Sequence, residues 1–336
     1  MDSKGYMLSQ LSAIIVTYKN NPILKQCLSS LSSSCGSVIE LIIVDNANDP
    51  ATKQLVAEYT NTKYVAAKEN LGFAGGNNLG LPYCTRDYIL LLNDDTIIEE
   101  EPFSDLIKYL HQHPNVGVVQ GTMLLPNCEN TLDSCGTFLT PFGIQKHRYF
   151  LEPLENLEEQ LQSLPVFSVK GALMLFCKEV LLKLNGVLFY DEFKSYYEES
   201  DFCHRVWLAG YEVHFVGTKP IQHLMGQTSN KFSQSEIWSQ YFANILFSFN
   251  TLLDNYGRWY ILPRFYLINC ANFFRCVICF KWKMVVAYFK VFPKYKKTAA
   301  LRKKVRKQIQ STRVISDREL FKKIMVKPSL RFYFKH

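Results

Sequence analysis

Three groups of polar residues follow directly on short apolar stretches, where they could bind a metal ion and phosphate. The groups are Thr17-Tyr18, Asp45-Asn46 and Asn93-Asp94-Asp95. A single carboxylate in such a position is usually a turn former or a helix cap, but three groups behind three separate stretches favour one shared site. Asp94 and Asp95 would repel each other, and both stay ionised most easily when a divalent cation bridges them to phosphate oxygens. The pattern therefore predicts a site for a metal-bound nucleoside diphosphate.

A glycine-rich segment, residues 69–80 (ENLGFAGGNNLG), has four glycines in twelve residues. Glycine permits positive φ and lets the main chain approach a ligand closely. The segment has neither the Gly-Lys-Ser/Thr ending of a P-loop nor the spacing of a dinucleotide-binding fingerprint. By itself it is equally compatible with a simple turn and with a loop that binds phosphate or sugar.

The elements that must position these residues are strands and helices in alternation. Apolar stretches typical of buried parallel strands lie at 11–17, 41–45, 64–66 and 88–92. A helix with Pro22 in its first turn separates the first two, and a second helix is expected at 51–59. The alternation predicts an α/β fold with a mainly parallel, doubly wound sheet, in which the polar residues at the strand ends meet in one crevice.

Composition divides the chain near residue 250. The 336 residues are 48% hydrophobic, enough for one large domain and an appendage. Residues 251–336 contain 21 Lys and Arg against 3 Asp and Glu, although the whole chain has a net charge of only +8. We therefore expect a catalytic domain over 1–250 and a helical, basic region over 251–336.

The ten cysteines are scattered, and the first ten residues lack the basic-then-apolar layout of a secretory signal. We therefore expect a cytoplasmic protein with free thiols. Cys270, Cys276 and Cys279 could suggest a metal site, but their spacing and the absence of a nearby second pair favour one face of a helix packed in a core.

Six blocks of sequence, in this order, resemble family 2 glycosyltransferases with the GT-A fold. They are VTYKN at 16–20, IIVDNAND at 42–49, ENLGFAGGNN at 69–78, LLNDDT at 91–96, KGALMLF at 170–176 and YEESDFCHRVWLAGY at 197–211, and KPIQHLMGQTS follows at 219–229. The resemblance covers about residues 11–230. Within the family, the blocks look most similar to those of rhamnosyltransferases that build bacterial surface polysaccharide.

The resemblance implies a set of contacts to a nucleotide-sugar donor. Thr17, Tyr18 and Asp45 would border the base and ribose, and Asn93 and Asp94 would flank the diphosphate. The glycine-rich segment would contribute further donor contacts. These are Asn70, Gly76 and Asn77.

The resemblance also implies a metal site for Mg²⁺ or Mn²⁺. Asp95 takes the last position of the family's D-x-D signature and would hold the ion, while Asn93 stands at the first position, where many members have Asp. His223 lies in a segment similar to the family's His-x-x-Gly-x-Ser/Thr ending, read here with Gly226 and Thr228. A lone histidine is more often structural, but in this context we expect His223 to complete the metal or diphosphate site.

The acidic block at 198–201 supplies the candidate catalytic base. We expect Glu198 and Glu199 to lie just before a helix that begins at Ser200 and ends at Gly210. Inverting transfer needs one base to take the proton of the acceptor hydroxyl, and Glu199 is the candidate. The family usually has Asp at this position, so Glu198 is kept as the second choice.

Asp201 and Arg205 are the remaining candidates of the acidic block. Their spacing favours an ordinary i, i+4 ion pair. We expect them to orient the base and the acceptor site without reacting, with a direct acceptor contact by Asp201 as the alternative.

In the basic region, residues 256–292 alternate aromatic residues with Lys and Arg, and no uncharged stretch is long enough to span a bilayer. We expect a surface that lies peripherally on the anionic inner face of the cell membrane, where a lipid-linked acceptor would be found. A pair of solvated helices is the second interpretation. No nucleic-acid partner is expected, because no nucleic-acid motif accompanies the basic residues.

The sequence thus predicts an inverting, metal-dependent glycosyltransferase that acts on a saccharide or a lipid-linked saccharide in polysaccharide synthesis. The first candidate donor is dTDP-rhamnose, and the alternative donors are a UDP-hexose and a UDP-N-acetylhexosamine. A hypothesis of another class is a non-catalytic, membrane-associated scaffold that retains the fold. The simultaneous presence of Asp95, Glu199 and His223 argues against it.

Overall fold

A mixed, mainly parallel sheet organises the first two thirds of the chain. The computed structural model describes residues 3–126, 130–157, 161–224 and 233–334. Within these residues the main sheet has the strand order β11 (Leu164–Pro165), β13 (Glu212–Phe215), β6 (Val116–Gln120), β12 (Leu173–Cys177), β4 (Tyr88–Asn93), β1 (Leu11–Thr17), β2 (Glu40–Asp45) and β3 (Thr62–Ala66). The strands from β4 to β3 are parallel, and β12 runs antiparallel to β4 and β6. The α/β fold class and the four predicted strands are therefore confirmed.

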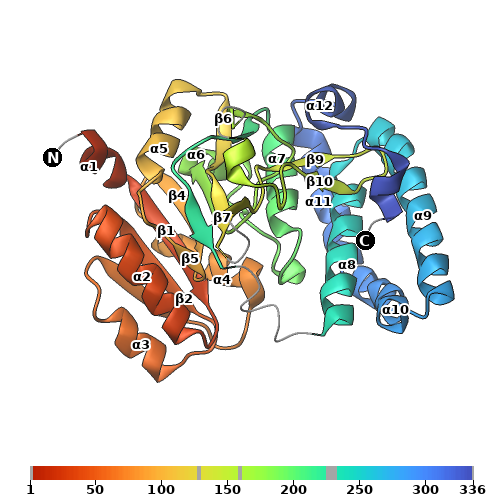
Figure 1. Ribbon diagram of the computed structural model, residues 1–336. Helices are drawn as coiled ribbons and strands as arrows, with labels where there is room; N and C mark the ends of the chain where they lie inside the picture. The colour runs from red at the N-terminus through yellow and green to blue at the C-terminus, as the bar shows by residue number, and fades with distance from the viewer. Residues whose placement is uncertain (1–2, 127–129, 158–160, 225–232, 335–336) are drawn as a thin grey trace.

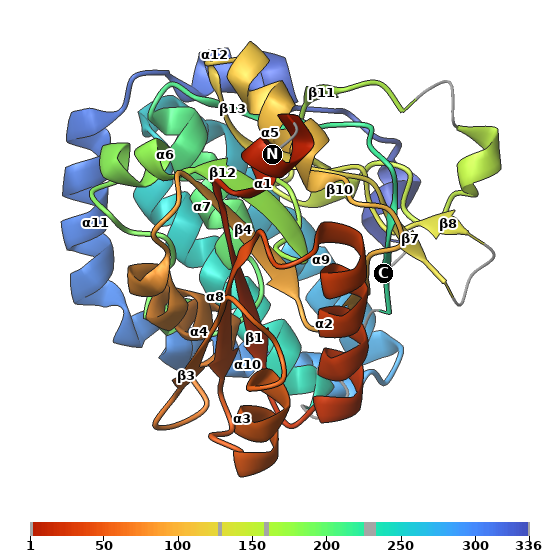
Figure 2. The same cartoon turned by 90° about the vertical axis from the view of Figure 1, so that its left-hand side faces the viewer.

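Helices cover both faces of this sheet. They are α1 (Ser3–Leu8), α2 (Asn21–Cys35), α3 (Pro50–Val56), α4 (Gly72–Gly80), α5 (Phe103–Gln112), α6 (Lys178–Lys183) and α7 (Glu198–Leu208). Successive residues of β1 serve opposite sides, since Ile15 shares a core cluster with α2 and α5 whereas Ile14 shares one with α4 and α7. Figure 2 shows α2 and α4 on either side of β1. This two-sided burial explains why the strands are continuously apolar.

The glycine-rich segment is neither a turn nor a phosphate loop, because most of it forms α4. Glycine weakens a helix, and tertiary packing accounts for its presence here. A Cβ on Gly76 would lie 2.6 Å from Val16 Cγ1, and one on Gly80 would lie 2.8 Å from Ile14 Cγ2. These glycines let α4 lie directly on β1, which sequence spacing alone did not reveal.

Helix α7 begins two residues earlier than predicted. Glu198 and Glu199 form its first turn instead of preceding it, and Tyr197 is the N-cap residue with φ of 73°. Tyr196 has a φ of 74° as well. Two consecutive left-handed tyrosines turn the chain sharply into the helix, a conformation that a residue-type pattern does not indicate.

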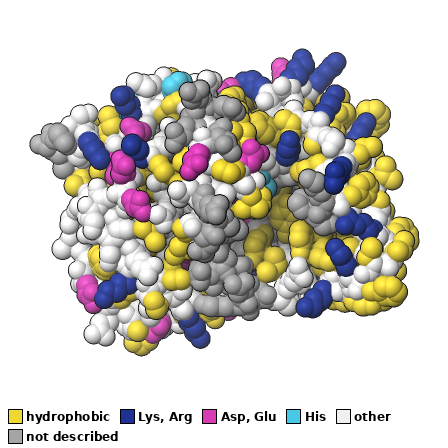
Figure 3. Space-filling view, in the orientation of Figure 1, with side chains coloured by type: hydrophobic (Ala, Val, Ile, Leu, Met, Phe, Trp, Pro, Cys, Tyr) yellow, Lys and Arg dark blue, Asp and Glu magenta, His cyan; other side chains and the backbone are white. Residues whose placement is uncertain are grey.

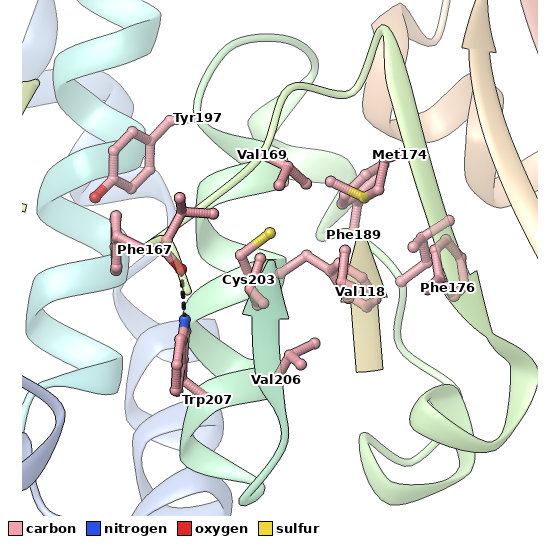
Figure 4. Packing of buried hydrophobic residues seen from close by; sticks show 14 of the residues in the cluster. Val118, Phe167, Val169, Met174, Phe176, Phe189, Tyr197, Cys203, Val206 and Trp207 are labelled. Atoms are coloured by element: carbon pink, nitrogen blue, oxygen red, sulfur yellow. Dashed lines mark hydrogen bonds between the residues drawn. The ribbon is translucent and has the colours of Figure 1, made fainter. Parts of the chain in front are cut away.

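The buried side of α7 packs on the loop before β12 and on that strand. Cys203, Val206 and Trp207 face Phe167, Val169 and Met174, as Figure 4 shows. The Trp207 indole N–H donates a hydrogen bond to the Val166 carbonyl oxygen at 3.1 Å. This packing fixes the first turn of α7 relative to β12 and the centre of the sheet.

Two small sheets extend the edge where β1 and β4 end. One has the order β5 (Thr96–Ile97), β14 (Ile221–His223), β7 (Met123–Leu125) and β8 (Thr131–Leu132), and the other pairs β9 (Thr137–Leu139) with β10 (Gln145–His147). In the first sheet His223 is the register partner of Thr96. It therefore lies beside the Asn93-Asp94-Asp95 segment, 130 residues away in sequence from Asn93. The short 3₁₀ helices are η1 (Leu81–Tyr83), η2 (Leu154–Asn156), η4 (Asp191–Phe193) and η6 (Leu330–Phe334).

The C-terminal part of the chain is helical. It consists of α8 (Gln234–Leu252), α9 (Asn255–Ile278), α10 (Trp282–Lys297), α11 (Ala299–Thr312) and α12 (Asp317–Ile324). Figure 1 shows these helices as a layer beside the sheet. The predicted division near residue 250 falls in the last turn of α8, whose Phe247 and Phe249 belong to the same core cluster as β4 and α7.

The three cysteines of this region are not packed as predicted. Cys270 and Cys279 are exposed, and Cys276 is half-buried. The three are spaced i, i+6 and i+9, which places Cys270 on a different side of the helix from Cys276 and Cys279, and none of them is buried in a core. The interpretation of these cysteines as core residues is therefore wrong.

Candidate active site

A cavity of about 1170 Å³ lies at the carboxyl ends of β1 and β4. Its walls come from the loop before β12, the first turn of α7, and residues of α8 and α10. Of the residues that the sequence singled out, the following line it: Thr17, Tyr18, Asn70, Asn93, Asp94, Asp95, Glu198, Glu199 and His223. Ligand sites of doubly wound sheets occupy the same position.

The donor side of the cavity begins with a buried polar pair. Thr17 Oγ1 donates a hydrogen bond of 2.7 Å to Asp94 Oδ2. The pair forms because β1 and β4 are adjacent parallel strands, with Val16 opposite Asn93. Tyr18 follows and also lines the cavity. The side chains predicted to approach a nucleotide thus meet where the strands end.

Asp45 does not line the cavity. Its carboxylate is fully buried, and it accepts hydrogen bonds from the main-chain N–H groups of Ala47 and Asp49 at 2.8 and 2.7 Å and from the Tyr64 hydroxyl at 2.9 Å. These bonds shape the turn after β2. Asn46 lines the cavity instead, and its Nδ2 donates to the Gly72 carbonyl oxygen at 2.9 Å.

The glycine-rich segment reaches the cavity only at its start. Asn70 lines it, whereas Gly76 and Asn77 lie inside α4 and do not. Asn77 is buried, and its Nδ2 donates to the Phe73 carbonyl oxygen one turn earlier at 2.9 Å. The structure therefore gives these two residues a place in the packing of α4 on β1.

Asp95 and His223 come together at the metal site that the resemblance implies. Asp95 Oδ1 is buried and makes no hydrogen bond to any of the described residues, and it lies 3.3 Å from His223 Nε2. Asn93 Nδ2 lies 3.4 Å from the same nitrogen. Burial opposes a charge on the imidazole, but the carboxylates of Asp133 and Asp95 outweigh it and raise the pKa of His223 to about 9.

A divalent cation fits this donor set only in part. Among the residues that the structure describes, no group of three or more His, Cys, Asp or Glu is arranged to hold a metal. A buried carboxylate oxygen without a hydrogen bond and a neighbouring imidazole are nevertheless ligand types that such ions accept. Asp95 and His223 would hold the ion, with the other positions left to phosphate oxygens and water. Gly226 and Thr228 lie outside the described residues.

Sequence reasoning missed the residues that fix His223. Asp133 is fully buried, and its Oδ2 lies 2.8 Å from His223 Nδ1 while its Oδ1 forms an ion pair with Lys170. Burial opposes ionisation of Asp133, but the two cationic partners outweigh it and lower its pKa to about 2. Lys170 begins the block at 170–176, which carried the resemblance. Asp133 lies in a segment with no motif, so no sequence signal identified it.

Glu198 and Glu199 both line the cavity, but their surroundings differ. Burial and the neighbouring Glu199 raise the pKa of Glu198 well above its usual value, and within the described part of the chain Glu198 Oε2 has no hydrogen-bond partner. Burial also raises the pKa of Glu199, to about 7, and its own main-chain N–H and the charge of Lys170 limit that rise. A general base works best with a pKa near the pH at which it operates. Glu199 is therefore better suited than Glu198 to accept a proton at neutral pH.

The turn that leads to these glutamates is held from α8. Asn244 Nδ2 lies within hydrogen-bond distance of three main-chain carbonyl oxygens, those of Phe193 at 3.0 Å, Ser195 at 3.3 Å and Tyr196 at 2.6 Å. The left-handed backbone of the two tyrosines is sustained by such surrounding contacts. A residue of the C-terminal helices thus positions the candidate base.

Asp201 and Arg205 form the predicted i, i+4 ion pair, with an Nε–Oδ2 distance of 2.8 Å. Both side chains are buried, and neither lines the cavity. Asp201 also accepts a hydrogen bond of 2.6 Å from the Ser248 hydroxyl, and Arg205 donates to the carbonyl oxygens of Val187 and Leu188. The pair joins α7 to its neighbours below the cavity.

The C-terminal helices supply a wall that the sequence did not indicate. Glu236 and Gln240 of α8 and Lys294 and Lys297 of α10 line the cavity. Lys294 Nζ lies 3.1 Å from Glu236 Oε2 and 3.1 Å from Gln240 Oε1. This wall depends on α10 folding back along α8, so no local motif could reveal it.

Comparisons with known proteins identify the family and the fold. Residues 12–178 match the family model described as glycosyl transferase family 2. The low-salt glycan biosynthesis hexosyltransferase Agl10 of Haloferax volcanii is 30% identical over 207 residues, which are 59% of this chain and 62% of that protein. The alignment thus spans less than two thirds of that relative's length.

Two further proteins are similar over larger shares of their own length. The rhamnosyltransferase WbbL of Escherichia coli is 25% identical over 221 residues, 60% of this chain and 79% of that protein. The solved structure of the mannosyltransferase PcManGT from Pyrobaculum calidifontis in complex with GDP-Man and Mn²⁺ aligns with a TM-score of 0.52 and 15% identity. It covers 87% of this chain and 75% of that one. At this identity the likeness shows the fold alone.

Proposed function

The chain belongs to glycosyl transferase family 2 and has the GT-A fold, and from that premise we propose that it transfers a sugar from a nucleotide-sugar donor to an acceptor hydroxyl. The observation that carries the proposal is the single cavity that joins Thr17, Asp94 and Asp95 at the strand ends to Glu199 on α7. The residues at the strand ends suit the binding of a sugar diphosphate, and Glu199 suits the deprotonation of an acceptor hydroxyl.

In the proposed reaction, Thr17, Tyr18, Asn93 and Asp94 orient the donor. The acceptor oxygen forms a bond to the anomeric carbon while the bond from that carbon to the diphosphate oxygen breaks, and the nucleoside diphosphate leaves. The hydroxyl proton passes to the Glu199 carboxylate. Attack from the side opposite the leaving group inverts the anomeric configuration.

When bound, a divalent cation would compensate the negative charge of the departing diphosphate. Asp95 and His223 would hold it, and Mg²⁺ and Mn²⁺ are the candidate ions. The Mn²⁺ in the structure of the mannosyltransferase PcManGT, which has the same fold, supports this choice.

The first candidate donor is dTDP-rhamnose, and the acceptor is a saccharide or a lipid-linked saccharide in polysaccharide synthesis. The similarity to the rhamnosyltransferase WbbL over 79% of its length supports this donor. The similarity to a hexosyltransferase supports the alternative, a UDP-hexose or a UDP-N-acetylhexosamine.

A donor panel tests the function. The purified chain is incubated with dTDP- and UDP-sugars and a lipid extract in Mg²⁺, in Mn²⁺ or in a chelator, and release of nucleoside diphosphate and of glycosylated product is measured. We expect turnover of one donor that stops in the chelator. Full turnover in the chelator, or full activity of Asp95→Ala, would contradict the role of the cation. Donor binding by calorimetry without any turnover would support a scaffold instead of an enzyme.

A further inference from the structure

Helix α9 exposes one apolar side along its whole length. Trp259, Leu267, Phe274 and Ile278 are between 63% and 74% exposed, and their spacing places them on one face of the helix. Ile261, Phe265 and Ile268 on the opposite side are buried against the protein. A helix on a soluble protein normally turns its apolar side inward, so α9 is apolar on two sides.

Helix α10 carries a matching stripe. Trp282, Val286 and Phe289 recur at i, i+4 and i+7 and are exposed, as is Phe292. The two helices touch through Phe273 of α9, whose ring centroid lies 5.5 Å from that of Tyr288 and 6.0 Å from that of Phe289. The exposed residues of these two helices therefore form neighbouring stripes, together called the α9–α10 surface below.

The charge around this surface has a single sign. Residues 255–297 contain nine Lys and Arg and no Asp or Glu. Lys281 and Lys283 flank Trp282 at the start of α10 and are exposed. In Figure 3, hydrophobic and basic side chains gather over these helices, whereas most acidic side chains lie over the sheet. Exposed Trp and Phe bordered by Lys and Arg are typical of segments that lie at a membrane–water interface.

We propose that the α9–α10 surface docks on an anionic lipid bilayer. An apolar surface of this extent needs a covering partner, and the uniformly positive charge around it complements acidic headgroups. The same charge opposes the pairing of two copies of the chain through this surface. A nucleic acid would satisfy the charge but would leave the aliphatic and aromatic side chains in water.

The surface lies on the bilayer and does not cross it. By length and composition, α9 is the one helix of the described residues that could cross a membrane. Its buried side, however, packs through Ile261 and Phe265 into the core cluster that contains α7 and α8. Crossing would separate those contacts, whereas docking leaves them intact.

Docking would also place the cavity close to the lipid surface. Lys294 and Lys297 lie in the last turn of α10 and line the cavity, while Phe289 and Phe292 of the same helix belong to the α9–α10 surface. If the proposed glycosyl transfer holds, an acceptor anchored in the bilayer reaches the cavity along this helix. This consequence rests on the proposed function, whereas bilayer docking does not.

Cosedimentation with vesicles tests the apolar contribution. The full chain is mixed with vesicles of phosphatidylcholine, with or without phosphatidylglycerol, and bound protein is measured by pelleting. The double variant Phe289→Ser/Phe292→Ser should bind the anionic vesicles at least about tenfold more weakly, because two side chains no longer enter the lipid. The matched control is Leu182→Ser/Val314→Ser, which removes two apolar side chains that are each 73% exposed elsewhere. It should bind like the parent.

A second pair of variants tests the charge. Lys281→Glu/Lys283→Glu should weaken binding to anionic vesicles by about tenfold or more, and added salt should weaken the binding of the parent. Lys25→Glu/Lys53→Glu changes two exposed lysines on α2 and α3 and should bind like the parent. Thermal unfolding of every variant verifies that it is folded.

Unchanged binding of the folded Phe289→Ser/Phe292→Ser variant would overturn the proposal. Equal binding to both kinds of vesicle, without dependence on salt, would overturn it as well. So would a dimer of the parent in lipid-free sedimentation velocity that this variant dissociates, because a second copy would then cover the surface. The vesicle assay contains no donor, so failure of docking and failure of sugar transfer are recorded separately.

Discussion

At the first turn of α7, two adjacent glutamates have the same side chain but different surroundings. Glu198 is buried and Glu199 is half-buried at the cavity wall. Burial raises the pKa of both, but the rise for Glu199 is limited to about 7 by its own main-chain N–H and by Lys170. Burial and the neighbouring Glu199 raise the pKa of Glu198 well above its usual value. A protonated carboxyl group cannot accept the acceptor proton, so the two residues predict different kinetic behaviour.

Glu199→Gln should lower kcat by about 10²–10⁴-fold, the usual contribution of a general base. Glu198→Gln should keep kcat within about a factor of ten. Because Glu199 must be ionised and its pKa is raised, kcat/KM of the parent should fall about tenfold per pH unit below about 7.

Initial rates of nucleoside diphosphate release across the pH range measure both effects. A larger loss for Glu198→Gln than for Glu199→Gln would assign the base to Glu198. A profile that stays flat from pH 8 to pH 5 would contradict a base with this pKa.

The buried cluster of Asp133 with Lys170 and His223 predicts a large loss of stability when its acid is removed. Asp133→Asn keeps the shape of the side chain but removes the counterion of the partly buried Lys170 and one of the two carboxylates beside the buried His223. Breaking a buried ion pair costs about 3–5 kcal/mol of unfolding free energy. Urea unfolding of the parent and the variant measures the difference.

The matched control is Glu236→Gln, which removes the acid that pairs with Lys290 and Lys294. The side chain of Glu236 is 45% exposed, so this change should cost about 1 kcal/mol or less. Equal losses for the two variants would show that burial does not distinguish the two clusters.

At the scale of elements, α4 shows why residue types alone misidentified a segment. Four glycines indicate a loop, because glycine disfavours helices, yet α4 is a helix in which Gly76 and Gly80 face β1 and β2. Its close approach fixes Asn70 and the start of the segment at the edge of the cavity.

Gly76→Ala should therefore destabilise the protein by about 1–3 kcal/mol through overpacking, although alanine favours helices by about 1 kcal/mol over glycine. The added Cβ would lie 2.6 Å from Val16 Cγ1. In the double variant Val16→Ala/Gly76→Ala, part of the loss should be recovered, and a double-mutant cycle in urea measures that coupling. Additive losses would mean that the helix shifts away instead.

At the scale of the whole molecule, the C-terminal helices complete the site. They hold the turn before Glu198 through Asn244 and supply one wall of the cavity. Helix α11 also closes the end of α8, because Arg306 donates to the carbonyl oxygens of Asn250 and Leu253 at 3.1 and 2.7 Å. The compositional break near residue 250 therefore falls inside continuous packing between the C-terminal helices and the rest of the chain.

A chain shortened to residues 1–250 should lose the part of the wall that α10 supplies and this closure. We expect its unfolding midpoint to fall by at least about 10 °C, since several kcal/mol of packing are lost and 1 kcal/mol changes the midpoint by about 2–4 °C. Circular dichroism during heating measures it, and an unchanged midpoint would show that the first 250 residues fold independently. Arg306→Ala should lower the unfolding midpoint of the full chain. Lys303→Ala, on the exposed side of the same helix, should leave the midpoint unchanged.

The sequence alone determined the βαβ order, the strands at the centre of the sheet and the polar residues at their ends. These features depend on the pattern of apolar and turn-forming residues along a short stretch of chain. It also identified Asp95, Glu199 and His223 as candidate site residues, through the resemblance of the surrounding segments to family 2 glycosyltransferases. Only the tertiary structure decided that Asp45 faces away from the cavity, that Asp133 and Lys170 fix His223, and that α8 and α10 form a wall. These contacts join residues that are far apart in the chain, and their positions depend on how whole elements pack.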